Sequence, residues 1–100
     1  MKQIYALIAA LGKTYQAEKI ILFGSRARGD NRERSDIDLA IYGMPQENRA
    51  FFWSDIDDLP TLLKFDLVHI TADTNTELVK NIEKDGVTLY ERSEAENLKF

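Results

Sequence analysis

Hydrophobic residues near the start of the chain recur at helical spacing. Ile4, Leu7, Ile8, Leu11 and Tyr15 follow the pattern i, i+3, i+4, i+7, i+11, which places them on one stripe of an amphipathic helix. This stripe accounts for the segment better than a secretory signal does, and the sequence holds no run of the ~18 apolar residues that a membrane span needs. We predict an N-terminal helix that packs on the rest of the domain.

Later periodicities predict four strands. Residues 19–23 form a β-branched and aromatic run that stops at Gly24, and residues 37–42 alternate between apolar and polar side chains. A third strand is predicted at residues 65–70 and an edge strand at residues 87–90. Because only a short polar segment joins the first two strands, they can be antiparallel, which would make the sheet mixed.

Two further stretches predict helices. One runs from residue 47 to about residue 63, with Pro60 as a break or kink near its end; its apolar positions are Phe52, Ile56, Leu59 and Leu63. The other covers residues 75–85, because Thr74 and Glu77 have the spacing of a capping box and Gly86 stands where a C′ glycine would. Helices and strands in this order predict an α/β domain, a mixed β-sheet backed by helices. We expect residues 1–91 to form this single domain and residues 92–100 to form a loosely held polar tail.

Composition narrows the class of protein. The chain has 100 residues, enough for one small core, and it contains no cysteine, so disulfides and thiolate metal sites are excluded and we expect a cytoplasmic protein. The formal net charge of −4 argues against general binding to nucleic acid. Four arginines nevertheless fall within residues 26–34, and this cluster is either a solvated loop or a local anion site. His69 is the only histidine and should face the opposite side of its strand from Asp66, so we expect a packed residue rather than a metal ligand.

One polar segment carries candidate chemistry. Residues two apart in a strand project from one face, so Asp36 and Asp38 would present neighbouring carboxylates at a sheet end. A cation relieves their repulsion, and hard oxygen ligands favour Mg²⁺ or Mn²⁺. Gly24 would let the backbone approach a ligand, and Ser25 could cap a short helix whose amides face an anion. An Asp-x-Asp pair alone is more often a surface feature, but the Gly-Ser pair before it favours a site for a metal and a triphosphate.

Residues 24–29 (GSRARG) and 35–39 (SDIDL) resemble the motif of the DNA polymerase β-like nucleotidyltransferase superfamily, and the chain is most similar to its minimal nucleotidyltransferases. The resemblance implies a single-domain nucleotidyltransferase fold that moves a nucleoside monophosphate from ATP, or another nucleoside triphosphate, to a hydroxyl. It also implies that Asp36 and Asp38 bridge two Mg²⁺ or Mn²⁺ ions. Asp66, the matching third carboxylate, would hold the first ion and could accept the hydroxyl proton.

The same resemblance implies how the nucleotide is held and which partner completes the site. Gly24 and Ser25 would position the distal phosphates, helped by Arg26 or Arg28. Minimal nucleotidyltransferases are typically paired with a small all-helical HEPN protein, as antitoxin and toxin, and the expected acceptor is a tyrosine of that partner. The alternative is a non-catalytic antitoxin or adaptor that binds nucleotide and neutralises its partner by forming a complex.

An aromatic triplet bears on that partner. If Phe52 faces the core, Phe51 and Trp53 lie on opposite flanks of the helical stripe. Either a wide core face absorbs both, or at least one reaches the surface and belongs to the interface of a hetero-oligomer.

Overall fold

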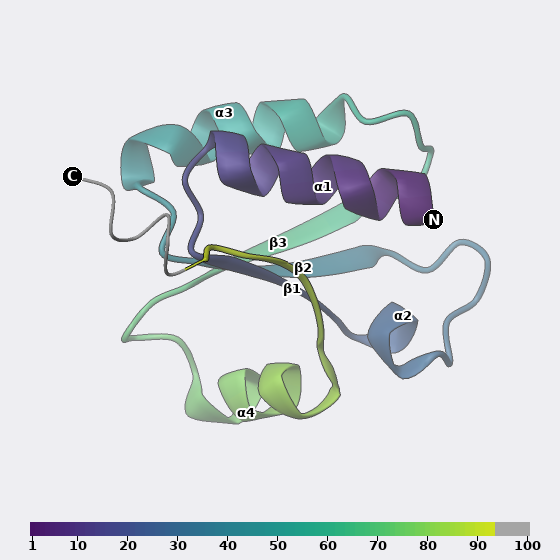
Figure 1. The fold of residues 1–100 in the computed structure, drawn as a ribbon. Helices are drawn as coiled ribbons and strands as arrows, with labels where there is room; N and C mark the ends of the chain where they lie inside the picture. Colours follow the sequence, from purple (N-terminus) through teal and green to yellow (C-terminus); the bar gives the residue numbers. More distant parts are fainter. Residues whose placement is uncertain (94–100) are drawn as a thin grey trace.

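The structure, a computed structural model, describes residues 1–93 (Figure 1). Its elements are α1 (Lys2–Thr14), β1 (Lys19–Phe23), α2 (Ser25–Arg28), β2 (Ile37–Tyr42), α3 (Gln46–Asp57), β3 (Phe65–Ile70), α4 (Thr76–Asp85) and β4 (Val87–Glu91). The predicted α/β class and all the predicted strands are confirmed. No helix among residues 1–93 is long and apolar enough to cross a membrane.

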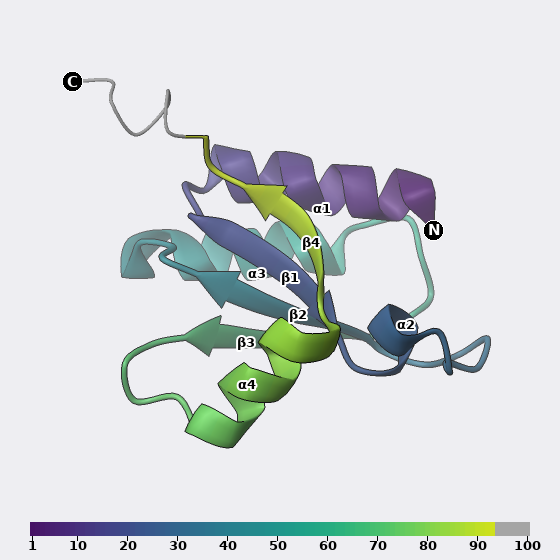
Figure 2. The same cartoon turned by 60° about the horizontal axis from the view of Figure 1, so that its bottom comes forward.

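The sheet is mixed, as predicted, with the strand order β3-β2-β1-β4. β1 runs antiparallel to both of its neighbours, whereas β2 and β3 are parallel. Helices α1 and α3 cover one face of the sheet and α4 covers the other (Figure 1). Figure 2 shows α2 at the end of the sheet where β1 ends and where β2 and β3 begin.

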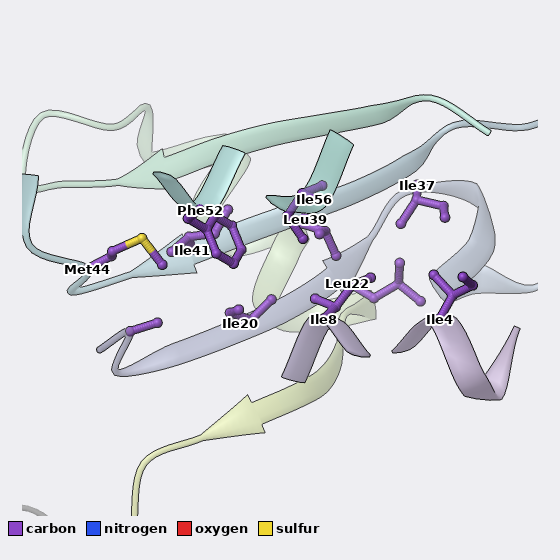
Figure 3. Close-up of a cluster of buried hydrophobic side chains, with 11 residues drawn as sticks. Ile4, Ile8, Ile20, Leu22, Ile37, Leu39, Ile41, Met44, Phe52 and Ile56 are labelled. Carbon is purple, nitrogen blue, oxygen red and sulfur yellow. The ribbon is translucent and has the colours of Figure 1, made fainter. Parts of the chain in front are cut away.

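The larger core lies between the sheet and the pair α1 and α3 (Figure 3). Its largest fully buried side chains come from these helices and the two central strands: Ile8, Ile20, Ile37, Leu39, Ile41, Phe52 and Ile56. Each such side chain stabilises the fold by about 1.5–3 kcal/mol relative to its exposed state. A smaller cluster of Ile21, Ala40 and Ile82 holds α4 on the opposite face.

Helix α1 buries a narrower stripe than its sequence pattern predicts. Ile4, Ile8 and Gly12 are buried, but Leu7 is 41% exposed. A Cβ on Gly12 would lie 2.6 Å from the Cδ1 atom of Ile20, so the helix lies close to β1 at this glycine. The buried edge of the helix is that of Ile4, Ile8 and Gly12, and Leu7 lies on the solvent side.

Helix α3 ends at Asp57, six residues before the predicted end at Leu63. Proline disfavours the helical conformation at the residue before it and lacks an N–H, so Pro60 ends the helix rather than kinking it. The α-helical hydrogen-bond pattern has already ended at Leu59, whose N–H donates to the carbonyl three residues earlier, that of Ile56, at 3.1 Å. The segment between α3 and β3 is therefore a loop that reaches the same end of the sheet as α2.

Helix α4 has a different cap from the predicted one. Asn75 is the N-cap, and its Oδ1 accepts a hydrogen bond from the N–H of Leu78 at 3.2 Å. Thr74 instead uses its hydroxyl to accept the N–H of Thr71. Gly86 directly follows the helix, as predicted, but its φ of −72° is not left-handed. A Cβ there would lie 2.3 Å from the Ile82 carbonyl oxygen, and close packing is what requires glycine.

The predicted loosely held tail is wrong at its first residue. The N–H of Arg92 donates to the carbonyl of Glu18, and its guanidinium donates to the carbonyls of Gln16 and Ala17, the shortest at 2.7 Å. Arg92 thereby closes the turn between α1 and β1. Residues 94–100 of the predicted tail lie outside the described residues.

Candidate active site

Strand register brings three separate segments together at one end of the sheet. Phe23, the last residue of β1, pairs with Asp38 on β2, and Asp38 pairs with Asp66 on β3. Gly24 follows Phe23 directly, so the Gly-Ser turn lies beside the carboxylates, as the sequence spacing predicts. The antiparallel pairing of β1 with β2 brings Gly24 beside Asp38, and the parallel pairing of β2 with β3 adds Asp66.

The predicted carboxylates are close to one another. Asp38 and Asp66 are direct partners in parallel strands, and their side chains therefore project from the same face of the sheet. Asp36 precedes β2 by one residue and is exposed, as is Asp66, whereas Asp38 between them is half-buried.

Electrostatics single out Asp38. Partial burial raises the pKa of its carboxyl above the ordinary value, and the nearby carboxylates of Asp66 and Asp36 raise it further. The guanidinium of Arg28 acts in the opposite direction and lowers this pKa. The site therefore holds more negative charge than its surroundings stabilise, which is the condition that a bound cation relieves.

Gly24 is in contact with Asp38. It has φ +75° and ψ −156°, a conformation that essentially only glycine adopts. A Cβ at this position would lie 2.2 Å from Oδ2 of Asp38. Glycine is therefore required where the turn passes this carboxylate.

Ser25 is not the cap of α2. The N-cap is Gly24, whose carbonyl accepts the N–H groups of Ala27 and Arg28, and Ser25 is the first helical residue. The four-residue helix ends at Gly29, which has φ +83°. Ser25 lies half-buried at the start of the turn, one residue from the glycine that contacts Asp38.

The two candidate arginines have different environments. Arg26 donates from Nε to the carbonyl of Ser35 and from Nη2 to the carbonyl of Glu33, both at 3.0 Å. It therefore ties α2 to the segment that leads into Asp36. Arg28 is more exposed, forms an ion pair with Asp30 at 3.2 Å and lies near enough to Asp38 to affect its pKa. Arg28 is consequently the better placed of the two to meet an incoming phosphate.

Oxygen donors of this kind fit a magnesium ion that is shared with a substrate. Within residues 1–93 no group of three histidine or acidic side chains is already gathered as a metal cage. Mg²⁺ does not need one, because it is usually held by one or two carboxylates together with waters and phosphate oxygens. Asp36 and Asp38, with Asp66 beside them, would supply those carboxylates.

A groove borders the carboxylates on the side of β3. It encloses about 440 Å³ and is lined by Arg34, Asp36, Leu62, Leu63 and Lys64, and we call it the Leu62 groove. Leu62 is fully exposed. Sequence reasoning missed this groove; its one available signal was the apolar pair Leu62 and Leu63, two residues after Pro60, where a loop is ordinarily polar.

The structure also gives the positions of His69 and of the aromatic residues 51–53. His69 is half-buried, and burial lowers the pKa of its imidazole, with the nearby Arg49 guanidinium adding to the effect. Phe52 is buried, while Phe51 and Trp53 are 64% and 56% exposed. The interpretation that at least one flanking aromatic reaches the surface is confirmed, and it holds for both.

A Gly-Ser turn held against paired carboxylates at a sheet end defines the class of nucleotidyltransferases. The family described as polymerase beta, nucleotidyltransferase, matches residues 6–95, and the chain belongs to this family. The resemblance inferred from residues 24–39 is thereby confirmed.

Two relatives come from Methanocaldococcus jannaschii. "Putative protein adenylyltransferase MJ0128" is 36% identical over 77 residues, which cover 75% of this chain and 79% of the relative. "Putative protein adenylyltransferase MJ0604" is 52% identical over 44 residues, which cover 42% of this chain and 44% of the relative. The second alignment thus spans less than half of that relative's length.

Solved structures share the fold. A toxin-antitoxin structure with AMP-PNP superposes with a TM-score of 0.64 at 23% identity and covers 95% of this chain and 78% of that chain. A complex of a tri-AMPylated Shewanella oneidensis HEPN toxin with an MNT antitoxin gives a TM-score of 0.60 at 22% identity, covering 98% and 79%. At these identities the similarity establishes the fold.

The crowded carboxylates should cost stability. We expect Asp38→Asn to raise the melting temperature at pH 7 by a few °C, since the charged Asp38 is less favourable in the folded than in the unfolded chain. The difference should shrink as the pH falls through the raised pKa toward the unfolded value of about 3.9, because wild-type Asp38 then takes up a proton. Thermal unfolding between pH 4 and pH 8 measures this. A variant that melts below the wild type at pH 7 would contradict it.

Proposed function

We propose that this chain transfers a nucleoside monophosphate, AMP from ATP, to a hydroxyl of a protein partner. The observation that carries the proposal is the contact of Gly24 with Asp38, in register with Asp66. It joins a turn suited to phosphate with carboxylates suited to a divalent cation. Membership of the nucleotidyltransferase family supports the reaction type.

Each residue has a proposed task. Asp36 and Asp38 hold the ions, and Asp66 accepts the proton of the acceptor hydroxyl. When bound, Mg²⁺ or Mn²⁺ polarises that hydroxyl and neutralises charge on the triphosphate. The turn at Gly24 and Ser25 orients the distal phosphates so that the α-phosphorus faces the acceptor, and Arg28 neutralises charge on the leaving pyrophosphate. Arg26 positions Asp36 through its hydrogen bonds to the preceding loop.

ATP is the proposed donor. Two relatives bear the name of protein adenylyltransferases, and one structure of the same fold is described as a toxin-antitoxin with AMP-PNP. Those names concern the relatives, and they favour an adenine nucleotide for this chain.

Ser25 should distinguish triphosphates from monophosphates. We expect Ser25→Ala to weaken ATP binding about tenfold and AMP binding hardly at all, because the lost hydrogen bond is to a charged distal phosphate. Calorimetric titration with ATP and AMP, with Ser54→Ala on the exposed side of α3 as the matched control, measures the difference. Equal losses for both nucleotides would remove Ser25 from this task.

The proposed acceptor is a tyrosine of a small helical HEPN-type partner. One neighbour in the fold comparison is described as an AMPylated HEPN toxin in complex with an MNT antitoxin. The two exposed aromatics of α3, Phe51 and Trp53, supply large apolar anchors of the kind found at interface centres.

Those anchors allow a direct test of the partner. We expect Phe51→Ala with Trp53→Ala to weaken the complex with the HEPN-type partner at least about a hundredfold, while the protein alone keeps its ATP affinity. Association is measured by calorimetry, and the control is Leu7→Ala, which removes another exposed apolar side chain.

The reaction itself is tested by incubating both proteins with Mg²⁺ and ATP labelled on the α-phosphate, followed by mass spectrometry. AMP on a partner tyrosine is the expected product. A stable complex without any adduct would favour the non-catalytic antitoxin or adaptor.

A further inference from the structure

The Leu62 groove lies where an acceptor would have to approach. It shares Asp36 with the carboxylate cluster, so the groove adjoins the proposed reacting centre. Its other walls are Leu62, Leu63 and Lys64 from the loop between α3 and β3, and Arg34 from the loop before β2. None of these four residues has a task in the mechanism above.

Strand order gives the direction of approach. Across the sheet end the sequence of segments is β1 with Gly24, then β2 with Asp38, then β3 with Asp66. In-line displacement places the attacking hydroxyl opposite the leaving pyrophosphate. If the distal phosphates lie at the β1 side, the hydroxyl arrives from the β3 side, where the groove opens.

We propose that the Leu62 groove binds the acceptor and selects a tyrosine flanked by acidic side chains in a polypeptide. This inference rests on the proposed function. The tyrosine ring packs on Leu62 and Leu63, and the acidic neighbours pair with Arg34 and Lys64. In the transfer step the tyrosine oxygen attacks the α-phosphorus, the bond from that phosphorus to pyrophosphate breaks, and pyrophosphate leaves with the electron pair. The hydroxyl proton passes to Asp66.

The lining of the groove favours a polypeptide over a nucleic acid. A volume of about 440 Å³ lies in the range of clefts that take one ligand-sized group. A fully exposed leucine at its mouth favours an apolar or aromatic side chain rather than a phosphate backbone. The two cations match two carboxylates, whereas the net charge of −4 opposes a long polyanion.

A charge-reversal experiment tests the selectivity. Two tyrosine peptides that differ only in acidic or lysine flanks are incubated with the protein, Mg²⁺ and ATP labelled on the α-phosphate. We expect the wild type to use the acidic peptide with a KM at least about tenfold lower, and the variant with Arg34→Glu and Lys64→Glu to prefer the lysine peptide. If the reversal variant does not fold, the variant with Arg34→Gln and Lys64→Gln takes its place and should abolish the preference. The matched control, Lys80→Glu with Lys84→Glu on α4, should retain it.

A binding experiment separates the groove from the reaction. Because the chain has no cysteine, Leu62→Cys introduces a single thiol for an environment-sensitive dye. The probe is the acidic peptide with phenylalanine in place of tyrosine, which can bind but cannot accept AMP. We expect a saturable spectral change at position 62 and none at a dye on Leu7→Cys in α1.

The outcomes distinguish this inference from the function on which it rests. A dye response without AMP transfer to any acceptor supports the groove and overturns the transferase function. Transfer without a dye response, or a peptide preference that the charge reversal leaves unchanged, overturns the groove. Transfer to an RNA oligonucleotide and to neither peptide would also overturn it.

Discussion

Replacing Asp38 by asparagine is expected to reduce nucleotide transfer to the protein partner at least about a thousandfold, or ~4 kcal/mol of transition-state stabilisation. The reason is the central position of this carboxylate, which is in register with Asp66 and lies against Gly24. An amide there has a similar shape but cannot supply the negative charge that a divalent cation needs. The rate is measured with ATP labelled on the α-phosphate, at saturating Mg²⁺.

The control for this substitution is Asp73→Asn, which removes an exposed carboxylate in the loop after β3 at the opposite end of that strand. It should transfer AMP at the wild-type rate. Circular dichroism shows whether the Asp38 variant is folded, and its expected higher melting temperature means that lost activity is not lost structure. Wild-type transfer by a folded Asp38 variant would remove this residue from the proposed metal site.

Gly24→Ala should disrupt both the backbone and the carboxylate cluster. The backbone conformation there is essentially restricted to glycine, and the added Cβ would collide with Oδ2 of Asp38 at 2.2 Å. We expect a loss of about 2–4 kcal/mol in the free energy of unfolding, together with at least a hundredfold loss of transfer, because Asp38 must move. Urea unfolding and the AMP-transfer assay measure the two effects.

Gly29→Ala is the matched comparison. Gly29 also has a positive φ, but among the described residues a Cβ there meets no atom within 4 Å. Its cost should be the conformational one alone, about 1–2 kcal/mol, with transfer retained. Equal losses of transfer in the two variants would show that the contact between Gly24 and Asp38 does not matter for the site.

The parts of this site that lie on adjacent segments of the chain were predictable from sequence. Gly24, Ser25, Asp36 and Asp38 belong to one antiparallel hairpin, and the alternation of residues 36–42 predicts that the two aspartates share one face. Asp66 came from the family resemblance, because nothing local in residues 65–70 indicates that β3 lies parallel to β2. Register between distant strands is set by tertiary packing, which no local periodicity records.

Other features required the packed structure. From the sequence, Arg26 and Arg28 had equal claims to bind nucleotide. Only the structure shows that Arg26 donates hydrogen bonds of 3.0 Å to the carbonyls of Ser35 and Glu33, which tie it to the loop before β2. The early end of α3 depends on whether Pro60 ends the helix or only kinks it. The sequence did not decide this, because the helical spacing of apolar residues continues past Pro60. The Leu62 groove then follows from that early end, because it leaves residues 58–64 as a loop.

The division of the site between two stretches of chain separates donor chemistry from acceptor choice. The groups proposed to bind ATP all lie within residues 24–38, which form the connection between β1 and β2 and the start of β2. The groups proposed to face the acceptor lie mainly within residues 62–66, which follow α3. Exchange of the second stretch between relatives should change which residues are preferred beside the acceptor tyrosine, while the use of ATP stays intact.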